Sequence, residues 1–356
     1  MRIVVSTFNN SKNNYGALFQ SCGLSSFLQQ QGYDVSFVTL EERKLHKQGI
    51  KAALKDVAKK IVLLPHAKKF KIREKKCRLF AKETQNQIVY PSSKELYADP
   101  PLADVYLSGS DQVWNPVAMH EDLFLAYAPK GSRKISYAAS MGSEKIPAEN
   151  RARFAELIGE YEAFSVREDT VVEIIRQFTD KPVVQHIDPV FLKSRLEWEK
   201  LETPYENIKF DKFIFLYAIE WSPDFNNRLK KLKEETGLPV VSVNIGNIKS
   251  VCADQIIYDA SPCEFLYLLH RAQTVVATSF HGVAMSIVYN KPFLPLAGIN
   301  MPTRIQSLMR HFQIKSPENC LRYTATDFER INEVILRDQI EAKEYIVKAV
   351  GFNGKD

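Results

Sequence analysis

The chain has 356 residues, of which 45% are hydrophobic, and its formal net charge is +6. This length exceeds what one ordinary core needs, so it predicts two α/β domains. No apolar run is long enough to span a bilayer, and the first residues have the pattern of a strand rather than of a signal peptide. The five cysteines are scattered, without the spacing of a zinc site or a redox pair. We therefore expect a soluble cytoplasmic protein.

Strand and helix patterns alternate through the first half of the chain. Apolar runs typical of strands cover residues 3–7, 35–39, 105–108, 134–139 and 163–166. Helical patterns cover residues 16–31, 148–160 and 168–178. The opening strand, helix and strand form a βαβ unit, which predicts a parallel sheet. Residues 185–210 are typical of a connection, so we place the domain boundary near Lys193 and the first domain over 1–192.

The second half begins the same alternation again. Strand patterns cover residues 212–217, 239–243, 274–278 and 292–296, and helical patterns cover residues 223–236, 262–271 and 302–312. We expect a second domain over 193–325 and then a C-terminal segment, 326–356, whose helix returns to the first domain. Two doubly wound, Rossmann-like α/β domains facing a cleft form a GT-B-like arrangement.

Basic residues concentrate between Arg43 and Arg78. Fourteen Lys or Arg and only two acids give this segment a net charge of +12, so the rest of the chain sums to −6. Apolar residues recur there at helical spacing, namely Ile50, Leu54, Val57, Ile61 and Leu64. The pattern of this basic insertion, about 43–80, is typical of a helix on an anionic membrane surface and equally of a solvated helix packed on its own domain. Nucleic acid is less favoured as a partner, because aromatic residues that stack on bases are few.

Two polar turns follow strand patterns. Ser-Phe-His-Gly at 279–282 opens a helix after the strand at 274–278, and Gly-Ser-Asp-Gln-Val-Trp-Asn-Pro at 109–116 follows the strand at 105–108. Free backbone N–H groups at a helix start favour an anion, and His281 can exchange protons with it. A histidine with a satisfied hydrogen bond in a first helical turn is the plainer alternative. Because the turns follow parallel strands, they predict a shared cleft.

Several short motifs occur in the order seen in one known family. They are Asn-Tyr-Gly-Ala-Leu-Phe-Gln at 14–20, the two turns above, Ser-Val-Arg-Glu at 165–168, Asp-Pro-Val at 188–190 and Pro-Thr-Arg-Ile at 302–305. From residue 1 to about 315 the chain resembles the polysaccharide pyruvyl transferase family. The resemblance implies a fold similar to GT-B glycosyltransferases. It also implies transfer of an enolpyruvyl-derived group from phosphoenolpyruvate to a sugar of a cell-surface polysaccharide or its lipid-linked precursor, giving a pyruvate ketal.

Such a reaction needs an acid and a base, and it needs cations that bind the carboxylate and the phosphate of the donor. We expect His281 as the leading acid or base and Asp111 as the second catalytic candidate. The expected donor-binding residues, on the second domain and around Arg167, are Arg167, Ser279, Gly282, Lys291 and Arg304. The expected acceptor-binding residues on the first domain are Asn14, Tyr15, Gly16, Gln112 and Trp114.

Plainer roles stand beside these assignments. Asp111 is equally an N-cap or Asx-turn residue, and Arg167 equally forms a surface pair with Glu168. Trp114 is equally a core residue, and Gly16 equally one that permits the turn. For Lys291 and Arg304, a solvated charge in a helix or turn is the more ordinary explanation.

One position departs from the family pattern. Several members carry an arginine two residues before the motif histidine, and here that position is Ser279. Either another arginine replaces this cation, or the donor differs, as in a GT-B-like glycosyltransferase that uses a nucleotide sugar. A non-catalytic glycan-binding relative is a further alternative. No Asp-x-Asp motif lies near the predicted cleft, so we expect neither a metal nor a cofactor. A lipid-linked acceptor would place the protein at the inner face of the plasma membrane.

Overall fold

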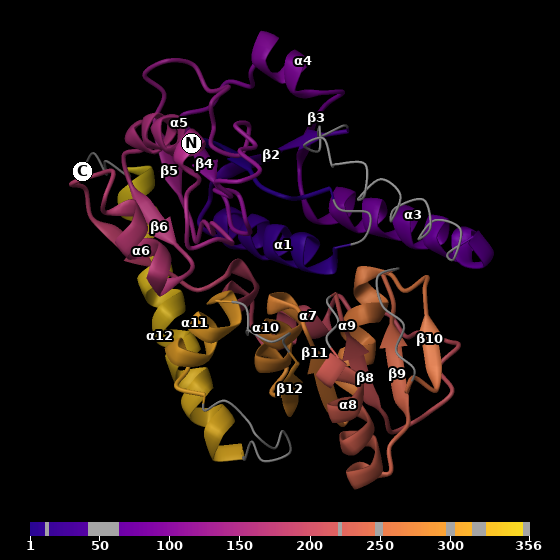
Figure 1. Cartoon of the computed structure of the whole chain (residues 1–356). Coiled ribbons are helices and arrows are strands. Elements are labelled where there is room, and N and C mark those ends of the chain that lie inside the picture. The colour runs from indigo at the N-terminus through magenta and orange to yellow at the C-terminus, as the bar shows by residue number, and fades with distance from the viewer. Residues whose placement is uncertain are drawn as a thin grey trace.

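The computed structural model describes residues 1–10, 14–41, 64–219, 223–245, 252–296, 303–314 and 325–351. Two parallel five-stranded sheets form the centres of two domains (Figure 1). The first sheet has the order β3-β2-β1-β4-β5 and contains β1 (Arg2–Ser6), β2 (Asp34–Leu40), β3 (Gln87–Tyr90), β4 (Val105–Ser108) and β5 (Lys134–Ser136). The second has the order β10-β9-β8-β11-β12 and contains β8 (Ile214–Tyr217), β9 (Val240–Val243), β10 (Gln255–Ile257), β11 (Thr274–Ala277) and β12 (Phe293–Pro295). This confirms the expected Rossmann-like, GT-B-like fold.

Helices flank both sheets. The first domain has α1 (Tyr15–Gln30), the 3-10 turn η1 (Leu64–His66), α3 (Ala67–Thr84), α4 (Ser93–Ala98), α5 (Ala148–Gly159) and α6 (Asp169–Ile175). The connection to the second domain has η2 (Pro189–Leu192) and α7 (Arg195–Glu199). The rest are α8 (Pro223–Thr236), α9 (Pro262–Arg271), α10 (Phe280–Val288), α11 (Thr303–His311) and α12 (Ala325–Val350). Capping explains two starts, since Ser194 and Ser261 each form a capping box with a glutamate at the third helical position.

The first sheet is extended by a short parallel pair, β6 (Phe164–Val166) and β7 (Val183–Gln185). Single bridges join Ala163 to Ile135 and Val166 to Ala139. The predicted strand at 134–139 is shorter in the structure, because Ala138 has a φ of 48° and interrupts β5. The short elements β3, β7, β10, α4 and α7 were not predicted, because their apolar patterns extend over too few residues.

The strand order of each sheet reverses between its central strands, β1 and β4 in one domain and β8 and β11 in the other. In open α/β sheets, ligands bind beyond the carboxyl ends of the strands at such a reversal. The register aligns Ser6 with Ser108 and Tyr217 with Ala277, so the turns that follow begin side by side. These turns therefore lie beyond the carboxyl ends of the central strands, where proteins with such sheets bind their ligands.

The two domains share one apolar core, centred on α1. This helix is buried along most of its length, and its aromatic residues reach the second domain. The ring centroids of Tyr15 and Phe19 lie 4.7 and 5.5 Å from that of Phe265 in α9. One continuous cluster of buried side chains includes residues of both sheets. The relative position of the domains is thus fixed by packing as well as by polar contacts.

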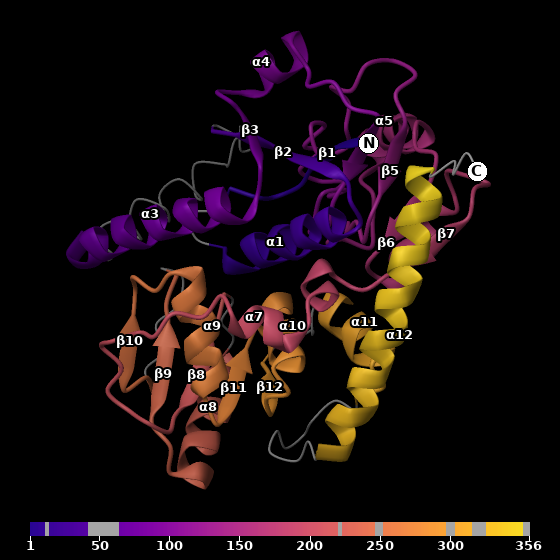
Figure 2. The ribbon, with the colours of Figure 1, turned by 180° about the vertical axis from the view of Figure 1, so that it is seen from behind.

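Helix α3 belongs to the predicted basic insertion and connects the domains at one end of their interface (Figures 1 and 2). Its Arg73 is 1% exposed and donates to the carbonyl oxygens of Asn244 at 2.8 Å and Tyr258 at 3.2 Å. Its Lys76 forms an ion pair of 2.7 Å with Glu264. One face of α3 therefore packs on its own protein. Most of the apolar positions of the predicted stripe, Ile50, Leu54, Val57 and Ile61, lie outside the described residues.

Helix α12 returns to the first domain at the other end of the interface, as expected (Figure 2). The Tyr345 hydroxyl donates to the carbonyl oxygen of Ser136 at 2.7 Å, and Arg133 Nη1 donates to that of Val350 at 2.7 Å. Near its start, Arg330 Nη1 donates to the side chain of Gln313, which follows α11, at 3.1 Å. Over the ranges that the structure describes, every helix is too short or too polar to cross a lipid bilayer.

We expect Arg73→Met to lower the free energy of unfolding by about 2 kcal/mol, because two partly buried carbonyl groups lose a charged donor. Urea unfolding followed by circular dichroism measures this difference. The control is Lys75→Met, at an exposed position of the same helix, which should change the free energy by less than about 0.5 kcal/mol. Equal effects of the two substitutions would contradict a bridging role for Arg73.

Candidate active site

His281 lies in the first turn of α10, directly after β11. Ser279 caps this helix, because its Oγ accepts a hydrogen bond of 2.9 Å from the backbone N–H of Gly282. The imidazole is largely buried and packs against the first turn of α1, where a Cβ added to Gly16 would lie 2.1 Å from its Nδ1. The absence of a side chain at Gly16 thus gives His281 the room to reach the first domain.

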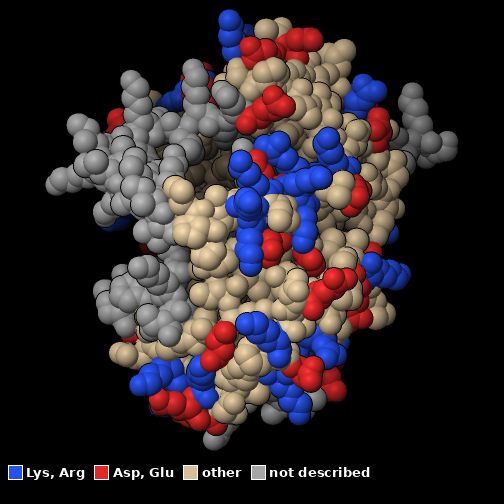
Figure 3. All heavy atoms as spheres, turned by 90° about the vertical axis from the view of Figure 1, so that its right-hand side faces the viewer, with Lys and Arg blue, Asp and Glu red and all other residues tan. Residues whose placement is uncertain are grey.

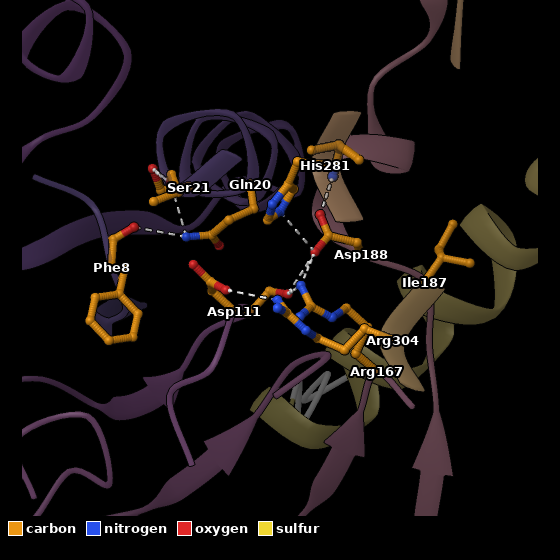
Figure 4. Close-up of polar contacts among 12 residues, drawn as sticks. Phe8, Gln20, Ser21, Asp111, Arg167, Ile187, Asp188, His281 and Arg304 are labelled. Atoms are coloured by element: carbon orange, nitrogen blue, oxygen red, sulfur yellow. Dashed lines mark hydrogen bonds and ion pairs between the residues drawn. The ribbon is translucent and has the colours of Figure 1, made fainter. Parts of the chain in front are cut away.

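The carboxylate of Asp188 faces His281 from the end of β7 (Figure 4). Its Oδ2 accepts hydrogen bonds from Arg167 Nη1 at 2.6 Å and Ser110 Oγ at 3.0 Å, and it lies 3.5 Å from His281 Nε2. Its Oδ1 accepts from the backbone N–H of Val190 at 3.1 Å. Burial alone would raise the pKa of Asp188, but His281, Arg167 and this backbone bond hold the pKa below its ordinary value. The carboxylate is therefore ionised at neutral pH.

Arg167 is a buried cation rather than part of a surface pair. Its Nε lies 3.1 Å from Glu168 Oε1, and its guanidinium carbon lies 4.2 Å from the ring centroid of Phe280. Burial alone would lower the pKa of Arg167, but Glu168 and Asp188 raise the pKa above its ordinary value, so the group stays charged. Its Nη2 is buried, and within the described part of the chain this atom has no hydrogen-bond partner. One donor of Arg167 is thus left for an anion.

Asp111 and Arg304 approach each other next to this group (Figure 4). Asp111 follows β4 with a φ of 73°, and its carbonyl oxygen accepts hydrogen bonds from the backbone of Val113 and Ser140. A left-handed backbone at a non-glycine residue is costly and is often found at functional sites. Arg304 Nη1, from α11 of the second domain, lies 3.9 Å from Asp111 Oδ1. The turn after β4 and a helix of the other domain therefore meet here.

A shallow pocket with a cavity volume of about 10 Å³ opens beside this cluster. It is lined by Arg167, Gln185, His186, Ile187, Asp188, Phe280, Arg304, Leu308 and His311. Burial lowers the pKa of His186 to about 4, so this ring is neutral at neutral pH. The positive charge on the pocket wall therefore comes mainly from the two arginines.

Two residues predicted to bind the acceptor are core residues instead. Trp114 is fully buried, and its Nε1 donates to the hydroxyl of Tyr161 at 3.3 Å. It cannot offer a stacking face to a sugar, because aromatic side chains already cover it. Tyr15 is 1% exposed, and its hydroxyl donates to the carbonyl oxygen of Ala260 at 2.7 Å. Both predictions were wrong, because the sequence does not show which way a side chain points from its turn.

Three further residues were predicted to bind the donor or the acceptor, namely Lys291, Asn14 and Gln112. Lys291 follows the far end of α10 and donates to the carbonyl oxygen of Ala272, so its prediction as a donor ligand was wrong. Asn14 is exposed and caps α1 by accepting from the N–H of Ala17. Gln112 is partly exposed and packs against Gly142. Asn14 and Gln112 stay predictions for the acceptor side.

Asp188, like Ser110 and Glu168, is a member of this cluster to which sequence reasoning gave no role. It belongs to the Asp-Pro-Val motif, but the residue before a proline is also an ordinary turn position. A signal was present, since the same motif order contains Arg167 and His281, the charged residues that Asp188 contacts. The structure adds that Asp188 is 1% exposed.

We expect Asp188→Asn to lower the free energy of unfolding by about 3 kcal/mol at neutral pH, because it removes one of the two buried carboxylates that pair with the buried Arg167. A carboxyl group with a lowered folded-state pKa stabilises the protein above its unfolded pKa, about 3.9, and this contribution is lost as the pH falls through the folded pKa. The difference between wild type and variant should therefore shrink below about pH 4. Urea unfolding across this range measures it. A constant difference, or the same trend in the exposed control Asp99→Asn, would argue against the buried pair.

We expect Gly16→Ala to destabilise the protein by about 1 to 3 kcal/mol, because its Cβ would displace the imidazole of His281. The control is Gly159→Ala, at the end of α5, where an added Cβ meets nothing within 4 Å. Denaturant unfolding compares the two variants. If Gly16→Ala were as harmless as the control, the close packing of His281 on α1 would be refuted.

The comparisons with known proteins agree with this architecture. In solved structures, the chain resembles the UDP-GlcNAc 2-epimerase from Neisseria meningitidis bound to UDP-GlcNAc, with a TM-score of 0.51, 13% identity, and coverage of 98% of this chain and 100% of that one. A putative UDP-N-acetylglucosamine 2-epimerase from Listeria monocytogenes gives a TM-score of 0.50 and 11% identity, with 98% and 90% covered. At such identities the likeness shows the fold alone.

The sequence comparisons assign the family. No curated protein matches the chain. The family model described as polysaccharide pyruvyl transferase matches residues 14–299. This range contains the turns of His281 and Asp111 and also Arg167 and Asp188, which the fold brings to one place. The chain therefore belongs to the polysaccharide pyruvyl transferase family, a family of enzymes.

Proposed function

We propose that this protein transfers an enolpyruvyl-derived group from phosphoenolpyruvate to a sugar of a cell-surface polysaccharide or its lipid-linked precursor, forming a pyruvate ketal. The observation that carries the proposal is the family match over residues 14–299. The pocket supports it, because the guanidinium groups of Arg167 and Arg304 line its wall, and guanidinium groups pair well with the carboxylate and the phosphate of a small donor. The reaction takes place in the cytoplasm, where phosphoenolpyruvate is made and a lipid-linked acceptor faces the enzyme.

The chemistry of ketal formation defines the groups that are needed. A proton is added to the methylene carbon of the donor, and the carbon that bears the phosphate becomes electrophilic. A sugar hydroxyl attacks this carbon and loses its proton to a base. The bond to the phosphate oxygen breaks, and phosphate leaves with the bonding electrons. A second hydroxyl then adds to the same carbon, gives its proton to the released phosphate, and closes the ketal. Cations are needed throughout, because the donor is strongly anionic.

The residues of the cluster suit these tasks. His281 is the acid or base, and the Asp188 carboxylate, 3.5 Å from its Nε2, orients the ring. Arg167 offers its unused Nη2 to the donor. Asp111 accepts a proton from a sugar hydroxyl or orients that hydroxyl. Asn14 and Gln112, which keep some exposed surface, bind the acceptor.

Arg304 replaces the cation that is missing at position 279. Ser279 is occupied as the cap of α10, and both Ser279 Oγ and the N–H of Gly282 are used in that bond. Arg304 comes from a different helix, but it lines the same pocket as Arg167 and faces Asp111. A guanidinium that enters from α11 instead of α10 therefore restores the charge without the usual sequence signal.

We expect Arg304→Ala to weaken the binding of phosphoenolpyruvate about tenfold or more, because one charge-assisted contact to an anion is lost. Calorimetric titration measures this affinity. The matched control is Lys291→Ala, which removes a cation that lies at the far end of α10, and it should bind as the wild type does. Equal loss in both variants would exclude Arg304 as a specific donor ligand.

The same titration distinguishes the proposed function from the alternatives. Binding of a sugar nucleotide such as UDP-GlcNAc, but not of phosphoenolpyruvate, would favour a glycosyltransferase and overturn the proposal. Binding of neither would favour a non-catalytic glycan-binding protein and would also overturn it. With a sugar acceptor present, His281→Ala should still bind phosphoenolpyruvate but release no phosphate, because binding and proton transfer use different groups.

A further inference from the structure

The outer face of α3 combines apolar and basic side chains. Ile72 is 47% exposed and Leu79 is 53% exposed, and their spacing of seven residues places them on one side of the helix. Exposed lysines at helical spacing continue the same stripe, namely Lys68, Lys75 and Lys82. We call the surface formed by these five residues the outer stripe.

The opposite face of α3 is fully used by the protein itself. Arg73, Cys77 and Phe80 are each at most 3% exposed and pack toward α1 and α9. Internal packing therefore explains the apolar residues of the inner face but not Ile72 and Leu79. Aliphatic side chains that alternate with lysines along one helix face have the pattern of a helix that lies on a lipid surface.

The charge of α3 indicates the kind of partner. The helix has eight Lys or Arg and two Glu residues, and one of the acids, Glu74, is paired with Arg78 at 2.7 Å. Figure 3 faces the side from which α3 projects in Figure 1, and Lys and Arg side chains gather there. The partner is therefore anionic.

The distribution of aromatic residues favours a lipid surface over nucleic acid. Phe80 is buried, and the ring of Phe70 packs against Tyr258 at a centroid distance of 5.5 Å. The outer stripe itself has only aliphatic side chains between its lysines. Stacking on bases requires exposed aromatic rings, whereas aliphatic side chains flanked by lysines enter the boundary between headgroups and acyl chains.

We propose that the outer stripe of α3 docks the protein on an anionic lipid bilayer. Ile72 and Leu79 insert at the headgroup boundary, and Lys68, Lys75 and Lys82 lie among the lipid phosphates. The docking does not depend on the proposed function, because it requires neither donor nor acceptor. Since α3 also contacts the second domain through Lys76 and Glu264, the docked protein keeps its domain interface beside the membrane.

The test is cosedimentation with vesicles of phosphatidylcholine containing about 30% phosphatidylglycerol, compared with vesicles of phosphatidylcholine alone. We expect binding to the anionic vesicles that weakens as salt is added. The triple variant Lys68→Glu/Lys75→Glu/Lys82→Glu should bind at least about tenfold more weakly. The control variant Lys130→Glu/Lys212→Glu/Lys343→Glu makes the same charge change at exposed lysines elsewhere and should lose much less.

A second variant tests insertion rather than charge. Ile72→Ser/Leu79→Ser should also weaken binding to anionic vesicles, by about tenfold, because inserted apolar surface is lost. Its control is Leu336→Ser/Ile340→Ser on α12, where both residues are about equally exposed, at 60% and 61%. Unchanged melting temperatures establish that the variants are folded.

Three outcomes would overturn the proposal. They are equal binding to neutral and anionic vesicles, equal losses in the variants and their controls, and binding to heparin or duplex DNA that survives Ile72→Ser/Leu79→Ser while vesicle binding is absent. The last outcome would assign the outer stripe to an anionic polymer. None of these results bears on phosphoenolpyruvate binding, so failure here is distinguishable from failure of the proposed function.

Discussion

The site depends on one buried anion. The Asp188 carboxylate is shielded from water, so its charge must be balanced by partners within the protein. Those partners come from separate parts of the chain, since Arg167 follows β6, Ser110 follows β4 and His281 begins α10 of the other domain. The contact that neutralises Asp188 therefore also brings the domains together at the site.

The fold class was predictable because it rests on local patterns. Alternating strands and helices predict two parallel sheets, and the turns after the strands predict that His281 and Asp111 share a cleft. The burial of single side chains was not predictable, because it depends on which segments, distant in sequence, cover each side chain. Tyr15 was assigned to the acceptor side, and Trp114 was assigned either to that side or to the core, yet other aromatic side chains cover both. Asp188 was passed over for the same reason.

The position of a cation also depends on tertiary structure. Lys291 is ten residues from His281 along the chain, but a helix separates them, and its ammonium group binds a carbonyl oxygen outside the cluster. Arg304 is farther away in sequence, yet α11 brings it to Asp111. A missing motif residue such as the arginine at position 279 is therefore weak evidence of lost function, because a guanidinium on a neighbouring helix can take its place.

The two bridging helices determine how far the domains can move. α3 and α12 connect them at opposite ends of the interface (Figures 1 and 2), and each is held by polar bonds to backbone carbonyl groups. A large rotation would break the bonds of Arg73 at one end or those of Tyr345 at the other, and it would separate His281 from Gly16 between them. The continuous core around α1 opposes the same motion. The protein's own contacts thus hold the charged cluster in place, and preorganisation of this kind lowers the cost of stabilising an anionic transition state.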